Sequence, residues 1–224
     1  MMRKRDKAIL NDLNRFRCMD RDSIAELHFS KLKNPQYAAN NVLLRLVRDN
    51  HIQRSTHFVP YVYFCTDSTM KKNSQKINHF LSILNVYKEM KRFEKTSTFQ
   101  VEPKYSKGMC EPDIFCIFQG SPFFIEVQRT VYSEKQMKEK LNRYLDLYSS
   151  GIMTNEPWQP VERKIFPHVL ILSDQRYAID NGYPFRVLQA TSISQFMKSI
   201  RPKEQFKPTK LTSSGSGKLK LNIQ

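Results

Sequence analysis

The sequence lacks the cysteine spacings that hold metal ions or build disulfide frameworks. Its four cysteines, Cys18, Cys65, Cys110 and Cys116, include no Cys-x-x-Cys pair, and no His-x-His pair accompanies them. A structural zinc site needs four clustered thiolate or imidazole ligands, and no local group of this kind can be assembled here. We therefore expect free thiols in a reducing compartment, without zinc or disulfides.

Long apolar runs are also lacking. No stretch approaches the roughly 20 consecutive apolar residues that a transmembrane helix requires. The first residues, Met1 to Arg5, lead into a polar helical pattern and not into the apolar segment of a signal peptide. These features predict a cytoplasmic protein that has no membrane partner.

Acidic residues are scarce relative to basic ones. The chain carries 37 Lys and Arg against 21 Asp and Glu, which gives a net charge of +16. Such an excess favours a polyanionic partner, because Lys and Arg that contact phosphates release counterions from a nucleic acid. The alternative is a basic surface that only keeps the protein soluble. Hydrophobic residues make up 40% of the chain, which is enough for packed cores, so we expect folded domains.

The first part of the chain has the pattern of three short helices. An apolar helix face comes first, and Ser23 and Glu26 then have the spacing of a capping box at the start of a second helix. Asn34 and Pro35 mark the start of a third helix, as N-cap and first helical residue, and we expect that helix to end near Asp49.

Two short strand patterns follow, at residues 52–56 and 61–65, around a turn at residues 57–60. Three helices followed by a hairpin predict a winged helix-turn-helix DNA-binding domain over residues 1–68. In such a domain one helix enters the major groove of double-stranded DNA. The alternative is a three-helix protein-interaction domain with an ordinary solvated face.

The polar face of the third helix has side chains that suit base recognition. Asn and Gln bind adenine edges, and Arg binds guanine or phosphate. Basic residues on the hairpin suit phosphate or minor-groove contacts. The candidate DNA-binding residues are Gln36, Tyr37, Asn40, Asn41, Arg45 and Arg48 on the helix, with Arg54 and His57 on the hairpin.

A second folding unit is predicted over residues 76–195, after a polar linker at residues 69–75. Its pattern is helix, three strands, helix, strand, at residues 76–93, 98–102, 113–118, 123–128, about 137–148 and 168–172. This αβββαβ order is that of restriction-endonuclease-like folds, so the expected class is α/β, or α+β for the whole chain. Residues 196–224 are basic and rich in Ser, which predicts a flexible basic tail.

Two carboxylates fall on adjacent strands of this second unit. Asp113 starts one strand and Glu126 ends the next. A tight turn centred between Gly120 and Ser121 would place Asp113 opposite Gln128 and diagonal to Glu126. Together the two carboxylates would hold Mg²⁺ or Mn²⁺, which polarises a phosphate and activates water. The alternative is structural, with Asp113 capping a strand and Glu126 paired with a nearby Arg or Lys.

Nuclease chemistry at this place has one missing component. PD-(D/E)xK nucleases carry Lys where Gln128 stands, and a neutral amide cannot supply that positive charge to the attacking water. Lys140, on the following helix, is the candidate to replace it. The candidate catalytic residues are therefore Asp113, Glu126, Gln128 and Lys140, but a lone carboxylate pair favours a unit that does not cleave DNA.

The stretch from Pro112 to Gln128, followed by Lys140-Leu141-x-x-Tyr144, resembles the replication-relaxation proteins of Gram-positive plasmids and mobile elements. The resemblance extends over roughly residues 5–195. Gln128 stands where that family usually has Asp. The residues that match the family pattern are Asp113, Gly120, Glu126, Lys140 and Tyr144, together with a preceding helix that carries His79 and Asn85.

The resemblance implies a winged helix joined to a nuclease-like half, and a role in replication, relaxation or transfer of a plasmid or mobile element. Replication or relaxase proteins would then be further partners. The leading hypothesis is sequence-specific binding of double-stranded DNA in that setting. The alternatives are a metal-dependent DNA nuclease or nickase that uses Asp113 and Glu126, and a transcriptional regulator, active as a homodimer, whose nuclease-like half only dimerises.

Overall fold

The computed structural model describes residues 2–94, 96–180 and 182–200. Within these ranges the chain forms six α-helices and two β-sheets, so the predicted class of mixed α and β structure is confirmed. Most of the predicted basic tail, residues 201–224, lies outside the described residues. No helix in the described part of the chain combines the length and the apolar character needed to cross a membrane.

The N-terminal unit, residues 4–65, consists of three helices and a small antiparallel sheet with the strand order β1-β3-β2. The two-residue strand β1 has no counterpart among the predicted elements. In chain order the elements are α1 (Lys4–Phe16), β1 (Met19–Asp20), α2 (Arg21–Phe29), α3 (Pro35–Arg48), β2 (Ile52–Ser55) and β3 (Val62–Cys65).

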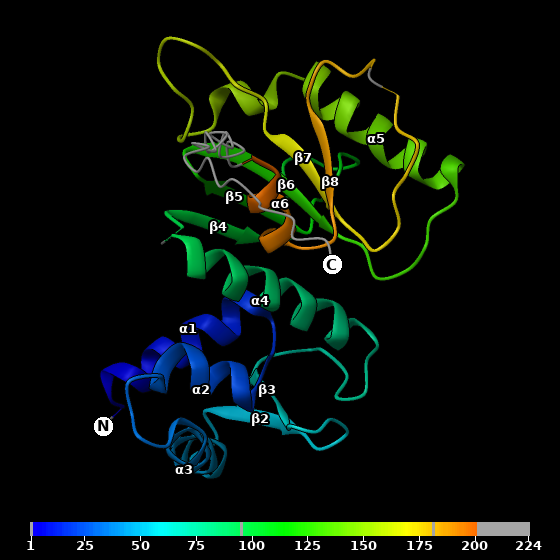
Figure 1. Ribbon diagram of the computed structural model, residues 1–224. Helices are drawn as coiled ribbons and strands as arrows, with labels where there is room; N and C mark the ends of the chain where they lie inside the picture. The colour runs from blue at the N-terminus through cyan, green and yellow to red at the C-terminus, as the bar shows by residue number, and fades with distance from the viewer. Residues whose placement is uncertain (1, 95, 181, 201–224) are drawn as a thin grey trace, which may run out of the picture.

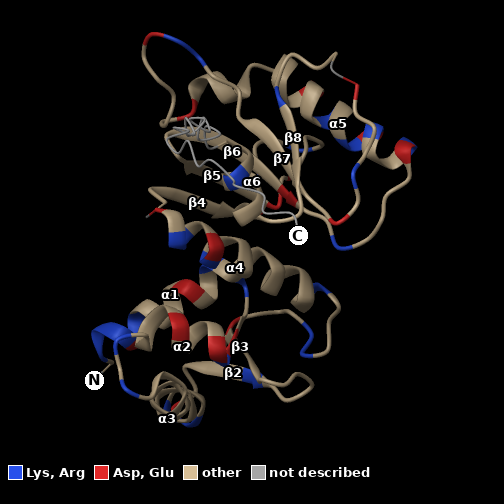
Figure 2. Ribbon diagram, in the orientation of Figure 1, with Lys and Arg blue, Asp and Glu red and all other residues tan. Residues whose placement is uncertain are grey.

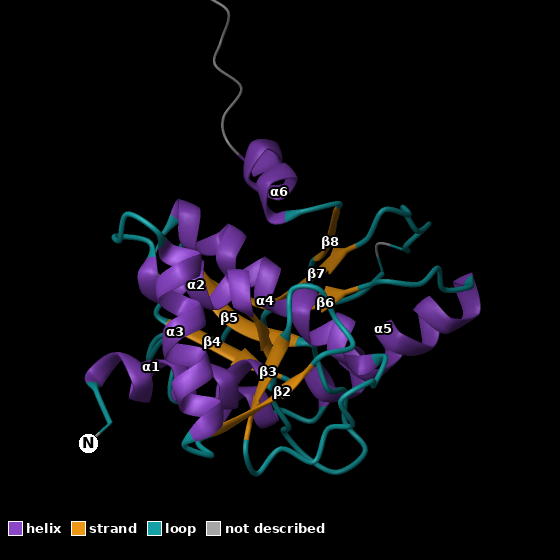
Figure 3. Cartoon of the chain, turned by 90° about the horizontal axis from the view of Figure 1, so that it is seen from below, coloured by secondary structure: helices purple, strands orange, loops and turns teal. Residues whose placement is uncertain are grey.

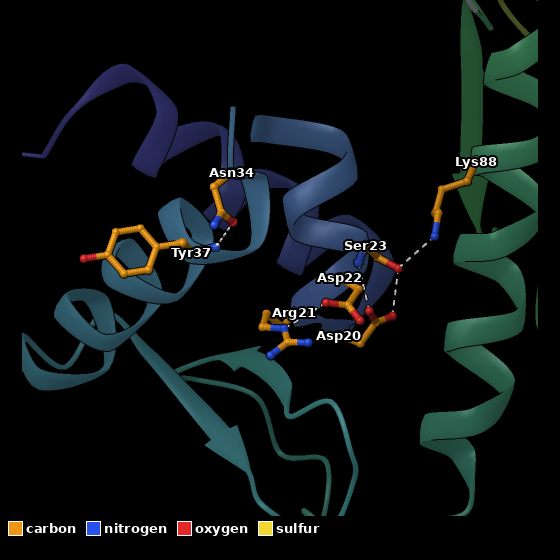
Figure 4. Close-up of polar contacts among 7 residues, drawn as sticks. All are labelled: Asp20, Arg21, Asp22, Ser23, Asn34, Tyr37 and Lys88. Atoms are coloured by element: carbon orange, nitrogen blue, oxygen red, sulfur yellow. Dashed lines mark hydrogen bonds and ion pairs between the residues drawn. The ribbon is translucent and has the colours of Figure 1, made fainter. Parts of the chain in front are cut away.

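The starts of α2 and α3 depend on side-chain caps, which Figure 4 shows. The side-chain oxygen of Asn34 accepts a hydrogen bond from the backbone N–H of Tyr37 at 3.1 Å, as the sequence predicts for α3. The predicted capping box at Ser23 is wrong, because α2 is capped by Asp20. That carboxylate accepts the backbone N–H of Ser23 at 2.8 Å and its hydroxyl at 2.7 Å. A negative charge at a helix N-terminus is also favoured by the helix dipole.

The C-terminal unit is built on a five-stranded sheet with the order β4-β5-β6-β7-β8. Strands β4, β5 and β6 are antiparallel, whereas β6, β7 and β8 run parallel. The last helix, α6, includes the first residues of the predicted tail. The elements are α4 (Lys76–Phe93), β4 (Thr98–Val101), β5 (Ile114–Phe118), β6 (Ser121–Val127), α5 (Glu134–Ser149), a short 3-10 helix (Ile152–Asn155), β7 (His168–Leu172), β8 (Val187–Ala190) and α6 (Ile193–Ile200).

Helices cover both faces of this sheet (Figures 1 and 3). Phe123 and Ile125 of β6 pack in the core that includes α4 and α6, and Phe124 packs in the core that includes α5. Successive strand residues point to opposite faces, so a central strand with two covered faces is apolar throughout. The continuous apolar run in β7 follows from this position.

One hydrophobic core joins the two predicted domains. It contains Phe16 of α1, Leu43 of α3, Ile83 of α4, Ile125 of β6 and Phe196 of α6. Helix α4 therefore lies between the N-terminal unit and the sheet, as Figure 1 shows. The predicted linker, residues 69–75, leads directly into this shared helix.

Polar contacts strengthen the same junction. The Arg15 guanidinium on α1 donates to the backbone oxygen of Phe99 on β4 at 3.0 Å. The Lys88 ammonium on α4 lies 2.7 Å from the carboxylate of Glu26. It also donates to the hydroxyl of Ser23 at 3.2 Å, a contact that Figure 4 shows. These contacts hold α1 and α2 against α4 and the edge of the sheet.

Adjacent leucines of α3 provide a test of this packing. Leu43 is fully buried, whereas Leu44 is 55% exposed. We expect Leu43→Ala to lower the free energy of unfolding by about 2–5 kcal/mol, since it leaves a cavity in the core. Leu44→Ala should change it by no more than about 0.5 kcal/mol. Chemical denaturation of both variants measures the difference, and equal losses would contradict the orientation of α3.

Candidate functional site

One side of α3 points away from the core of the N-terminal unit. Figure 1 shows this helix end-on, at the part of the unit farthest from the five-stranded sheet. Each helical residue is rotated by about 100° from the last, so the exposed positions share one face about 140° wide. We call this surface the α3 face. Its exposed members are Gln36, Tyr37, Asn41, Leu44 and Arg48, and Asn40 lies half-buried on the same face.

Tyr37 and Leu44 are the large side chains of the α3 face. Tyr37 is 65% exposed and Leu44 is 55% exposed, and Figure 4 shows Tyr37 projecting away from the unit. On the opposite side of the helix, Ala39, Leu43 and Leu46 are fully buried. The apolar side of α3 is thus the side that packs against the unit.

Arg45 does not belong to this face, although the sequence analysis places it among the DNA-binding residues. Its guanidinium lies 2.8 Å from the carboxylate of Asp6, a residue that is 1% exposed. Burial by itself would raise the pKa of Asp6, but hydrogen bonds from Arg45 and from the backbone of Arg3 outweigh it and lower that pKa. Removing Arg45 would leave a buried carboxylate without its cation. Its role in this structure is to hold α3 against α1.

The other predicted basic contacts remain at the surface. Arg48 is 74% exposed on its side chain and pairs with the neighbouring Asp49 at 2.9 Å. The guanidinium of Arg54 on β2 lies 5.2 Å from the centre of the Tyr61 ring, which restricts its direction. His57 is exposed in the turn between β2 and β3.

Two further basic residues adjoin α3 and were not among the predicted contacts. Lys31 and Lys33 are exposed in the loop between α2 and α3, immediately before the N-cap residue Asn34. Figure 2 shows basic segments in this loop and on β2, separated by α3 in that view. Their position directly before the predicted cap at Asn34 is the sequence signal that could have identified them.

A second candidate site lies on the C-terminal unit, where Asp113 and Glu126 meet in a register other than the predicted one. Phe118 pairs with Ser121, so two residues form the turn, and the register continued along the strands places Asp113 opposite Glu126 instead of Gln128. The two turn residues have φ values of 51° and 70°. Two consecutive positive φ values give a turn whose twist matches that of the flanking strands.

Glu126 is buried and has both carboxylate oxygens in contact with α5. The Tyr144 hydroxyl donates to Oε1 at 2.5 Å, and the Lys140 ammonium lies 2.5 Å from Oε2. Lys140 and Tyr144 are four residues apart, so they share one face of the helix. Lys140 thus reaches the carboxylate from the position that the sequence analysis proposed for it.

Asp113 is also held on both oxygens. Its Oδ2 accepts the backbone N–H of Val127 at 2.7 Å, and its Oδ1 lies 3.2 Å from Nε2 of His79 on α4. The hydrogen bond with Asp113 raises the pKa of His79. His79 was connected to the site only by the family resemblance, since nothing in its spacing indicates Asp113 as a partner.

The charges in this carboxylate cluster influence one another strongly. Burial raises the pKa of Glu126 to about 7, and the charge of Asp113 adds to that effect, whereas the contacts with Lys140 and Tyr144 only partly oppose it. Burial lowers the pKa of Lys140, but the charges of Glu126 and Asp113 raise it by more. Glu126 therefore changes its charge near neutral pH, while Lys140 stays protonated.

The cluster as arranged does not fit Mg²⁺ or Mn²⁺. All four oxygens of Asp113 and Glu126 have protein partners within 3.2 Å, and one partner is the ammonium group of Lys140. Such cations need oxygen ligands that are free to coordinate. Within residues 2–94, 96–180 and 182–200, no group of three or more His, Cys, Asp or Glu side chains is placed to hold a metal ion.

Gln128 lies outside these contacts. Its backbone N–H donates to the backbone oxygen of Leu172 at 2.9 Å. Both polar atoms of its side-chain amide are buried and have no hydrogen-bond partner among the described residues. Of the four predicted catalytic residues, the structure thus joins Glu126 with Lys140 directly and places Asp113 beside them. No family model, no curated protein and no solved structure matches the chain.

The titration of Glu126 makes a specific prediction about stability. A carboxyl whose pKa is raised by folding destabilises the folded state when ionised, so this contribution to stability increases as the pH falls from about 8 to about 5. We expect the unfolding free energy of the wild type, relative to Glu126→Gln, to rise across that range. Glu139→Gln, at an exposed position of α5, is the matched control and should show no such trend. A difference that stays constant with pH would contradict the raised pKa.

A second prediction concerns the divalent cations. Because every carboxylate oxygen of the cluster is already engaged, we expect Mg²⁺ and Mn²⁺ to leave the melting temperature unchanged. A metal site saturated at ten times its Kd would add about 1.4 kcal/mol to the unfolding free energy. Thermal melting with and without each cation measures this. A rise in melting temperature that Asp113→Asn abolishes would overturn the structural interpretation of the cluster.

Proposed function

We propose that the protein binds double-stranded DNA through the α3 face, as a winged helix-turn-helix protein does. The observation that carries the proposal is the face itself. It presents amide, aromatic and aliphatic side chains on the exposed side of a capped helix whose opposite side is fully packed. A rigid helix of this kind has the dimensions that fit the major groove.

The surrounding elements support this proposal. Helices α2 and α3 follow each other closely, and β2 and β3 form a hairpin directly after α3. We infer that α2 and α3 form the helix-turn-helix pair and that the hairpin is the wing. Sheet order β1-β3-β2 is in keeping with that arrangement. Arg54 and His57 on the hairpin would then lie near the DNA backbone.

Basic residues are available for phosphate contacts next to the α3 face. Lys31 and Lys33 precede the helix and Arg48 ends it, and all three are exposed. The net charge of +16 supports the same kind of partner. Phosphate contacts set the position of a protein on the duplex, whereas base contacts supply specificity.

For the C-terminal unit we propose a nuclease-like fold that does not cleave DNA. The αβββαβ order from α4 to β7 supports the fold, and the full engagement of the carboxylates of Asp113 and Glu126 supports the absence of cleavage. The resemblance to replication-relaxation proteins leads us to propose a role on plasmid or mobile-element DNA. A transcriptional regulator that dimerises through this unit is the alternative, and footprinting on DNA flanking the gene distinguishes the two.

Phosphate contacts make the proposed binding sensitive to salt. We expect the affinity of the full chain for a duplex of about 30 base pairs to fall at least about tenfold between about 50 and 200 mM salt. Lys33→Ala should weaken binding to all sequences equally and reduce the slope of log affinity against log salt by about one. Fluorescence anisotropy measures both effects.

The matched control is Lys138→Ala, which removes a charge that is also exposed, from α5 in the C-terminal unit. It should leave the affinity and the salt slope close to those of the wild type. The proposal fails if the full chain shows no binding to duplex DNA at low salt. It also fails if Lys138→Ala reduces binding as much as Lys33→Ala, because the contacts would then lie elsewhere.

A further inference from the structure

We infer that the α3 face recognises A·T base pairs in the major groove, so that the preferred site is A·T-rich. The inference rests on the proposed DNA binding and names the sequence class that this binding would select. It follows from which side chains of α3 are free and which are engaged within the protein.

Three side chains of the α3 face are amides. Gln36, Asn40 and Asn41 lie on the exposed side of the first two turns of the helix. An Asn or Gln amide donates to N7 and accepts from N6 of one adenine, which gives a bidentate contact that guanine cannot reproduce. The part of a recognition helix that reaches base edges is its N-terminal part, and the amides are concentrated there.

An aliphatic side chain lies at the centre of the same face. Leu44 is 55% exposed, and the helical rotation places it between Asn40 and Asn41 in angle around the axis. Contact with the C5-methyl group of thymine would remove apolar surface of Leu44 from water, which is favourable in free energy. Only A·T pairs present this methyl group in the major groove. The amides, which suit adenine, and Leu44, which suits the thymine methyl group, therefore both favour A·T base pairs.

Arginine, the usual side chain for guanine, is paired with an acidic residue at both of its positions in α3. Arg45 and Arg48 are the basic residues of α3, and the guanidinium of Arg45 is held by the buried carboxylate of Asp6 at 2.8 Å. Arg48 is the last helical residue and pairs with Asp49, so it lies at the end of the helix that is farther from the base edges. The bidentate Arg contact to guanine is the commonest specific contact in protein–DNA complexes. Its exclusion shifts the preference to A·T.

Charge decides between DNA and a protein as the partner of this face. The exposed Lys31 and Lys33 stand at one end of α3 and Arg48 at the other, and the whole chain carries an excess of 16 positive charges. A protein-docking face would favour a continuous apolar patch, whereas here the amides of Asn40 and Asn41 lie along the helix between Leu44 and Tyr37, the two large exposed side chains. We therefore commit to duplex DNA.

The first experiment is selection of bound sequences from a library of random duplexes by the full-length protein. We expect the enriched sequences to share an A·T-rich core, bound at least about tenfold more tightly than a G·C-rich duplex of equal length. Enrichment of a G·C-rich core, or none at all, would overturn the inference while leaving DNA binding intact. Absence of binding to any duplex at low salt would overturn the proposed function as well.

The second experiment tests the thymine contact directly. Replacing thymine by uracil in the selected site, one position at a time, removes single methyl groups and keeps the hydrogen bonds. The wild type should lose about fourfold in affinity for each contacted methyl group. Leu44→Ala should bind the thymine duplex more weakly and should no longer distinguish thymine from uracil. Val161→Ala, a 94% exposed site in the C-terminal unit, is the control and should behave as the wild type.

Amide contacts need their own variant. Asn41→Ala should lose at least about fivefold in affinity on the selected site and less on random DNA. Asn78→Ala, at an exposed position of α4, is the matched control. Equal losses on both DNAs for Asn41→Ala, or a Leu44→Ala protein that still distinguishes uracil from thymine, would overturn the assignment of these residues to base recognition.

Discussion

The burial of α4 on both of its sides is the constraint on which the rest of the structure depends. Ile77, Ile83, Leu84 and Met90 of this helix are fully buried within a core that also holds residues of α1, α3, β6 and α6. A helix that is apolar around most of its circumference has to be covered from more than one direction. The N-terminal unit supplies one cover and the five-stranded sheet supplies the other, so neither unit completes its core without α4.

Two buried carboxylates, Asp6 in the N-terminal unit and Glu126 in the C-terminal unit, follow the same physical rule. A carboxylate removed from water requires a cation or hydrogen-bond donors. Asp6 takes Arg45 and Glu126 takes Lys140. Arg45 was a candidate for DNA binding and Lys140 a candidate for catalysis. In this structure each of them is paired with a buried acid instead. The proposed specificity of α3 and the proposed lack of cleavage in the C-terminal unit both derive from these two pairings.

Local signals in the sequence predicted much of the fold and less of the site. The Asn34 cap and the apolar periodicity of α3 fix the start and the buried face of that helix, because both depend on neighbouring residues alone. The pair of Arg45 with Asp6 joins positions 39 residues apart, which periodicity does not detect. The turn between β5 and β6 shows the same limit of local signals. Gln119 and Gly120 both have positive φ, and this two-residue turn sets a β5–β6 register that the alternation within each strand does not reveal. The strands were therefore predictable, but the partner opposite Asp113 was not.

The contact of Arg15 with the backbone of Phe99 affects which substitutions would abolish function. Because α1 is bonded to the sheet edge and shares a core with it, we expect the two units to fold and unfold together. Substitutions deep in the sheet would then deplete the population of molecules competent to bind a ligand at α3, although they lie far from it. A genetic screen for loss of function would accordingly recover many positions in β5, β6 and β7, and their distribution would map the folding unit and not the contact surface.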